Sequence, residues 1–260
     1  MKYEDVIVET RGAAAWITIN RPDKMNAFRG RTCDELIHAI GKAGYDKSIS
    51  AIVLAGAGDR AFCTGGDQSA HEGQYDGRGT IGLPMEELHA IIRDVPKPVI
   101  ARVQGYAIGG GNVLCTICDF TIASEKAVFG QVGPKMGSVD PGYGTAFLAR
   151  VVGEKKAREI WYMCRRYSAA EALAMGLVNA VVAPDKLDAE VQKWCDEIAE
   201  KSPTAIAIAK RSFNMDTAHQ AGIAGMGLVA LKLYYDTEES REGVKAQKEK
   251  RKPEFKKYAK

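Results

Sequence analysis

The 260-residue chain lacks a strong net charge, a disulfide framework and long apolar runs. Its formal net charge is only +3, which is too small to indicate a nucleic-acid partner. No apolar run is long enough to cross a bilayer, and the start of the chain does not resemble a signal peptide. We therefore expect a cytoplasmic protein with neither a nucleic-acid nor a membrane partner.

The six cysteines are scattered, and the four histidines show no clustered spacing. Cys115 and Cys118 form one CxxC pair inside an apolar segment, and no second pair completes a zinc site. We interpret both as buried thiols and expect no metal. With 46% hydrophobic and 27% charged residues, the composition is that of an ordinary globular protein with a sizeable core.

Strand-like and helix-like segments alternate along most of the chain, which predicts an α/β layered fold. The expected strands cover residues 6–10, 14–20, 51–55, 98–104, 119–123 and 177–183. Two expected helices begin at residues 32 and 112. The other expected helices cover residues 85–92, 145–151, 154–166, 169–175, 187–201, 205–214 and 222–250. Thr32, with Glu35 three residues later, is expected to cap the first helix.

The chain divides into a core, residues 1–200, and a helical C-terminal region, residues 201–260. Helices that do not pack on the core must bury their apolar stripe elsewhere, so we expect this region to form a subunit interface. Residues 69–83 are polar and rich in glycine, which predicts a mobile loop over a site.

Two glycine-rich segments are candidate functional loops. The first, Gly105-Tyr-Ala-Ile-Gly-Gly-Gly-Asn112, lies between two apolar segments. If a helix begins at these glycines, its first N–H groups are free to bind an anion or a developing oxyanion; the alternative is a tight turn with close packing. The second segment, residues 129–144, carries a hydroxyl and a carboxylate two residues apart, Ser138 and Asp140.

Residues 61–67 and 105–111 together resemble the paired oxyanion loops of the crotonase (enoyl-CoA hydratase/isomerase) superfamily. The similarity extends from the Asn20–Phe28 turn to Phe255. It implies a spiral of ββα units and an acyl-CoA thioester substrate. It also implies trimers paired into hexamers. No cofactor is expected, because CoA is part of the substrate.

The resemblance also assigns binding roles to particular residues. The amides of Gly66 and Gly110 would hold the thioester oxygen as it gains enolate charge, which fits the large effect that such donors have on rate. CoA would bind at a turn and at the C-terminal tail, through Lys24, Asn26, Ala27 and Lys250. Asp67 would brace the first oxyanion loop through backbone hydrogen bonds.

Side chains around the enolate decide the reaction. Hydratases of this superfamily carry two glutamates, where this chain has Val113 and Gly133, and neither residue can transfer a proton. Residues 130–140, 155–161 and 234–235 instead resemble a branch with two activities. Its 1,4-dihydroxy-2-naphthoyl-CoA synthases close a ring, and its 2-ketocyclohexanecarboxyl-CoA hydrolases open one.

The branch resemblance implies a catalytic set of Ser138, Asp140 and Tyr235. Some synthases hold bicarbonate at a Gln-Thr-Gly segment and a tryptophan. Here three residues match that possible anion or water site, Gln131, Gly133 and Trp161, while Val132 replaces the threonine. The base is therefore either Asp140 or a bound anion.

Two departures from the synthases favour ring opening. The chain starts at its first strand, and the segment 69–83 offers a single tyrosine, Tyr75. We therefore predict hydrolysis of a cyclic β-keto acyl-CoA, from 2-ketocyclohexanecarboxyl-CoA to pimeloyl-CoA. The alternatives are the ring-closing synthase and an inactive crotonase-fold scaffold.

Overall fold

The computed structural model describes residues 1–68, 75 and 77–259. Residues 69–74 and 76 lie outside the described part, and with them seven of the fifteen residues of the expected mobile loop, 69–83. Within the described part, no helix combines the length and apolarity needed to cross a membrane.

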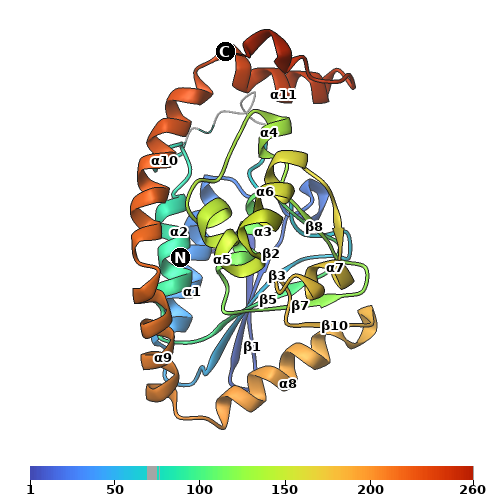
Figure 1. Cartoon of the computed structure of the whole chain (residues 1–260). Helices are drawn as coiled ribbons and strands as arrows, with labels where there is room; N and C mark the ends of the chain where they lie inside the picture. Colours follow the sequence, from blue (N-terminus) through green and yellow to red (C-terminus); the bar gives the residue numbers. More distant parts are fainter. Residues whose placement is uncertain (69–74, 76, 260) are drawn as a thin grey trace.

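The larger of two sheets has six strands in the order β1-β2-β3-β5-β7-β10 (Figure 1). Its first pair is antiparallel and its other pairs are parallel. The strands are β1 (Val6–Arg11), β2 (Ala14–Ile19), β3 (Ala51–Gly56), β5 (Val99–Val103), β7 (Phe120–Ser124) and β10 (Ala180–Val182). Every residue of β3 is buried, as expected for a parallel strand covered on both faces. These six match the strands expected from the sequence.

The smaller sheet has four short strands in the order β4-β6-β8-β9. They are β4 (Ala61–Cys63), β6 (Tyr106–Ile108), β8 (Val128–Gly130) and β9 (Tyr167–Ser168). None of the four was expected from the sequence: three lie in or next to the glycine-rich loops, and β9 lies between two expected helices. β4, β6 and β8 run parallel, so their carboxyl ends meet at one edge of the sheet. The two expected oxyanion loops, residues 61–67 and 105–111, and the glycine-rich segment 129–144 all extend from that edge.

Helices cover both sheets and build the C-terminal region. They are α1 (Gly30–Tyr45), α2 (Met85–Asp94), α3 (Gly110–Ile117), α4 (Gly133–Met136), α5 (Leu148–Val152), α6 (Glu154–Met163), α7 (Ala169–Ala174), α8 (Leu187–Ala199), α9 (Pro203–Asp216), α10 (His219–Tyr235) and α11 (Glu238–Lys248). A π-helical turn, Tyr143–Phe147, precedes α5. Figure 1 shows α9 and α10 along one side of the core, where both contact α2.

Two helix boundaries correct the sequence analysis. Helix α1 begins at Gly30, so Thr32 is its third residue and accepts a hydrogen bond from the Arg29 N–H. Glu35 accepts bonds from the backbone of residues 4 and 5 instead of closing a cap on Thr32. The expected helix 222–250 is two helices, because the Thr237 hydroxyl accepts the Ser240 N–H and starts α11.

The hydrophobic core lies on both faces of the larger sheet. On one face, α8 contributes Leu187, Val191 and Cys195 to a cluster around Trp16 and Val53. The main cluster on the other face includes Cys115 and Cys118, which confirms that both are buried thiols. It also includes Ala224, Leu228, Leu231 and Tyr235, so α10 packs against the core.

A buried lysine fastens α9 to the core. Lys210 Nζ donates to Asp119 Oδ2 at 2.7 Å and to the carbonyls of Lys97 and Ile92 at 2.8 and 2.9 Å. The Lys210 side chain is only 6% exposed. Lys210→Met removes one hydrogen bond from each of these three acceptors, of which Asp119 Oδ2 keeps the Val99 N–H at 2.8 Å. We therefore expect the free energy of unfolding to fall by about 2–4 kcal/mol.

Urea denaturation measures this loss. The control is Arg211→Met, whose ion pair with Asp94 at 3.4 Å joins two well-exposed side chains and whose loss should cost less than about 0.5 kcal/mol. Equal stability of the two variants would show that Lys210 does not anchor α9.

Candidate active site

A cavity of about 740 Å³ lies at the edge where the parallel strands of the smaller sheet end. The loops after β4, β6 and β8 form one side, and α10 and α11 contribute the other. Ten of the twelve residues expected in the site line this cavity: Ala27, Gly66, Gly110, Gln131, Gly133, Ser138, Asp140, Trp161, Tyr235 and Lys250.

The backbone around Gly66 directs its amide into the cavity. The Phe28 N–H donates to the Gly65 carbonyl at 2.8 Å, and the Asp67 N–H donates to the Phe28 carbonyl at 2.9 Å. In such a parallel bridge the central residue, Gly66, points its own N–H away from Phe28. This N–H has no acceptor among the described residues, and Gly66 lines the cavity.

Gly110 supplies a second amide because it is the first residue of α3. An N–H in the first turn of a helix has no partner within the helix, and no described residue accepts this one. The preceding residue, Gly109, has φ +57°, which favours glycine.

The two loops touch at their glycines. A Cβ on Gly65 would lie 2.9 Å from the Gly110 nitrogen, and a Cβ on Gly110 would lie 2.6 Å from Phe28 Cζ. Close packing and an oxyanion site are thus not alternatives here, because the close approach brings the two free amides to one cavity.

The three expected catalytic side chains face this cavity. Ser138 Oγ lies 2.8 Å from the Tyr235 hydroxyl, although the two residues are 97 positions apart in the sequence. The Gly144 N–H donates to Asp140 Oδ1 at 3.0 Å. The hydrogen-bond partner of the Ser138 side chain is therefore Tyr235.

Burial shifts both titratable groups. It raises the pKa of Asp140 to about 7, against the smaller opposing effect of the Gly144 hydrogen bond. The Asp140 side chain keeps some accessible surface, but that surface lines the cavity. Burial also raises the pKa of Tyr235, opposed by the Ser138 hydrogen bond and reinforced by the nearby Asp140 charge. At neutral pH, Tyr235 is a proton donor and Asp140 populates both its forms.

The Trp161 side chain has no donor left for the possible anion or water site. The Trp161 indole N–H, its single donor, is bonded to the Gly144 carbonyl. Val132 has no hydroxyl to replace the missing threonine. Trp161 instead supports the segment whose Gly144 amide holds Asp140, so its expected role as an anion or water ligand is corrected. Asp140 remains a candidate base, while the alternative of a bound anion keeps Gln131 and Gly133 of its three expected residues.

Gln131 and Tyr75 add polar groups to the lining of the cavity. Gln131 is 1% exposed, and neither its amide oxygen nor its amide nitrogen has a partner among the described residues. The Tyr75 hydroxyl accepts from Gln68 Nε2 at 2.6 Å, and its ring lies edge-on to Tyr235 with centroids 6.4 Å apart. A Cβ on Gly66 would collide with the Tyr75 hydroxyl. The sequence analysis counted Tyr75 only as a loop tyrosine and gave it no role.

Two expected CoA contacts lie away from the cavity lining. Lys24 is exposed in a 3₁₀ turn, Pro22–Lys24. Asn26 is fully buried, and its Nδ2 donates to the carbonyls of Ala57 and Ala61 at 2.9 and 2.8 Å. The expectation for the Asn26 side chain is therefore wrong, because its hydrogen bonds are spent on holding the turn. Three cations that line the cavity were missed: Lys135, Arg166 and Arg251.

The architecture matches solved structures of acyl-CoA enzymes. An enoyl-CoA hydratase from Mycobacterium avium subsp. paratuberculosis K-10 superposes with a TM-score of 0.86 at 29% identity, over 98% of this chain and 99% of that one. A carnitinyl-CoA hydratase from Mycobacterium avium gives 0.85 at 29% identity over 98% and 100%. A monofunctional enoyl-CoA isomerase from M. smegmatis gives 0.72 at 29% identity over 82% and 94%.

The fold is that of the crotonase superfamily, whose members process acyl-CoA thioesters and are typically oligomeric. The family model for enoyl-CoA hydratase/isomerase matches residues 9–258, so the chain belongs to that family. The expected superfamily and α/β fold class are thereby confirmed.

Proposed function

We propose that this protein hydrolyses the ring carbon–carbon bond of a cyclic β-keto acyl-CoA, converting 2-ketocyclohexanecarboxyl-CoA to pimeloyl-CoA. The observation that carries the proposal is the cluster of Asp140, Tyr235 and Ser138 beside two free glycine amides. The cluster offers a base near neutrality, a protonated phenol and two oxyanion donors, which a retro-Claisen cleavage requires.

The site does not support hydration of a double bond. The two positions at which hydratases carry glutamate hold a fully buried Val113 and a glycine, Gly133. A Cβ on Gly133 would lie 2.5 Å from the Ser138 carbonyl and 2.6 Å from Trp161, so no larger side chain fits there. Among the described residues that line the cavity, Asp67 and Asp140 are the only acids.

In the proposed reaction, Asp140 takes a proton from water as the water oxygen adds to the ring ketone. The adduct collapses and the bond between the ketone carbon and the α-carbon breaks. The electron pair moves into the thioester, whose oxygen accepts hydrogen bonds from the Gly66 and Gly110 amides. The α-carbon then takes the proton that Asp140 holds, either directly or from Tyr235, which Asp140 reprotonates. The former ketone carbon becomes the carboxyl group at the far end of the opened chain, and its acid proton is released to solvent.

An assay with three substrates tests the proposal. Purified protein is incubated in H₂¹⁸O with 2-ketocyclohexanecarboxyl-CoA, with o-succinylbenzoyl-CoA and with crotonyl-CoA, and products are followed by mass. We expect pimeloyl-CoA carrying one ¹⁸O in its new carboxylate. Turnover of o-succinylbenzoyl-CoA alone would identify the ring-closing synthase, and turnover of none would favour the inactive scaffold.

Tyr235→Phe removes the phenol that bonds Ser138, and we expect kcat to fall by about 10²-fold, since a positioned proton donor typically contributes this much or more. Binding of a substrate analogue should change little, because the ring is kept. Tyr234→Phe is the matched control, since Tyr234 does not belong to the cavity lining. Equal kcat in both variants would remove Tyr235 from the chemistry.

The proposal includes a homotrimer or hexamer built through residues 201–260, which also complete the active site. Large apolar side chains of α9 and α10 are exposed on the single chain: Ile208, Phe213, Met215, Ile223, Met226, Val229 and Leu233. A face of this kind is typical of a protein–protein interface. The CoA tail would extend past Ala27 and Lys250, with its phosphates near the cations at the cavity mouth.

A further inference from the structure

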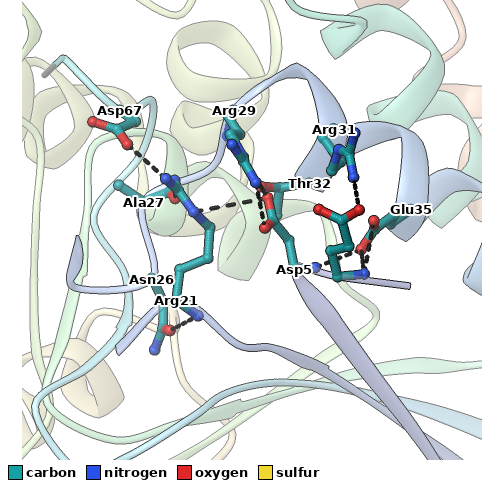
Figure 2. A network of polar contacts seen from close by, with 10 residues as sticks. Asp5, Arg21, Asn26, Ala27, Arg29, Arg31, Thr32, Glu35 and Asp67 are labelled. Carbon is teal, nitrogen blue, oxygen red and sulfur yellow. Dashed lines mark hydrogen bonds and ion pairs between the residues drawn. The ribbon is translucent and has the colours of Figure 1, made fainter. Parts of the chain in front are cut away.

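Figure 2 shows a network of polar contacts that extends from Asp67, at the end of the first oxyanion loop, through Arg21 to Asp5 and helix α1. The Arg21 side chain is 13% exposed. Its guanidinium donates to Asp67 Oδ2 at 2.8 Å and to the Ala27 carbonyl, and its Nε lies 3.7 Å from Asp5 Oδ2. One side chain thus reaches three chain segments.

Two of these contacts reach parts of the candidate site. Asp67 directly follows Gly66, and its N–H already donates to the Phe28 carbonyl. The hydrogen bond from Arg21 therefore holds the Asp67 side chain in addition to its backbone. Ala27 lies on the turn that lines the cavity and directly precedes Phe28. Arg21 thus fastens both strands of the Phe28–Gly66 bridge that sets the direction of the Gly66 N–H.

The third contact anchors Arg21 to the core. Asp5 accepts from Arg29 at 2.8 and 2.9 Å and from the Thr32 hydroxyl at 2.6 Å, and its own N–H donates to Glu35. Burial alone would raise the pKa of Asp5, but these hydrogen bonds and the arginine charges outweigh it and lower that pKa. Asp5 is therefore a permanent anion held against helix α1.

We propose that Arg21 is a positioning residue that sets the Gly66 amide at the oxyanion site and couples it to the CoA-binding turn. The inference rests on the proposed role of Gly66 and Gly110. A guanidinium suits this task because its planar fork of N–H donors reaches several acceptors at once, whereas a lysine ammonium acts as one compact charge.

The test follows the thioester carbonyl of a bound probe by infrared difference spectroscopy. The probe is cyclohexanecarboxyl-CoA with a ¹³C thioester carbon, which has no ring ketone and so is not cleaved. In the wild type we expect the carbonyl band to move to lower wavenumber on binding, because two amides polarise the bond. Arg21→Gln should lose much of this shift, Arg21→Lys should be intermediate, and kcat should fall by about 10–10²-fold in Arg21→Gln.

Arg29→Gln is the matched control. It removes two bonds to the same Asp5 but touches neither Asp67 nor Ala27, so its stability loss should leave the band shift intact. A full band shift and unchanged kcat in Arg21→Gln would overturn the inference; if that variant does not fold, a full shift in Arg21→Lys does so. A wild-type protein that binds the probe without any shift would instead refute the oxyanion site itself.

Discussion

Asp140→Asn is expected to lower kcat by about 10³-fold, within the range that a positioned general base contributes. The substitution keeps the shape of the side chain and the acceptor for the Gly144 N–H, but it removes the group that takes the proton from water. Binding of cyclohexanecarboxyl-CoA, measured by calorimetry, should stay within a few-fold of the wild type. A variant rate within threefold of the wild-type rate would exclude Asp140 as the base.

The pH dependence gives the same carboxyl an independent check. Because the base must be ionised, wild-type kcat/KM should rise with pH through about 7, the value to which burial raises the pKa of Asp140 in the free protein. A bell-shaped or flat profile below pH 8 would point to another group.

The raised pKa also predicts an effect on stability. In the unfolded chain an aspartate titrates near ~3.9, so the folded state holds a proton that the unfolded state has lost over the pH range between the two values. The contribution of Asp140 is therefore fully favourable below pH ~4 and is lost as pH rises through about 7. Asparagine stays neutral, so Asp140→Asn should be more stable than the wild type at pH 8, by on the order of 1–3 kcal/mol, and nearly equal to it at pH 4. Urea denaturation at both pH values measures the difference, and an equal gain at both would contradict the raised pKa.

Gly110→Ala is expected to lower kcat/KM by about 10²–10³-fold, the typical effect of losing one oxyanion donor. The added methyl group would lie 2.6 Å from Phe28 Cζ and 3.2 Å from the Gly65 Cα. Either the start of α3 or the Phe28 ring must move, and both support the pair of amides. Steady-state kinetics and the carbonyl band of the bound probe should change together.

The control for this variant is Gly41→Ala. Gly41 lies in α1, outside the proposed interface, and an added Cβ would meet Ile91 Cδ1 at 3.7 Å, an ordinary van der Waals contact. Alanine at such a helical position should leave activity unchanged and be neutral or slightly stabilising, by up to about 1 kcal/mol. If Gly110→Ala matched this control in activity, the Gly110 amide would not be an oxyanion donor.

The sequence predicted those elements whose apolar pattern extends over enough residues to be recognised. The six strands of the larger sheet are mostly runs of five or six residues with a clear apolar signal, and all were located. Strands β4, β6 and β8 have three residues each, too few for a period-two pattern, so they were read as glycine loops. The break between α10 and α11 was also missed, because Thr237 stops the helix by a local hydrogen bond within a continuous helical pattern.

Residue types and their spacing alone indicated that one glycine-rich segment could offer free amides and that Ser138 and Asp140 lie on one loop. The resemblance to the crotonase superfamily added the second amide, that of Gly66, and the absence of the two hydratase glutamates. Tertiary structure decided the rest. The parallel pairing of β4, β6 and β8 brings three separate loops to one edge, and the packing of α10 returns Tyr235 to Ser138 across 97 positions. It also decided that Trp161 and Asn26 spend their hydrogen bonds internally and that Arg21 reaches residues 5, 27 and 67. Such contacts depend on how distant segments meet, and a linear pattern carries information only about neighbours along the chain.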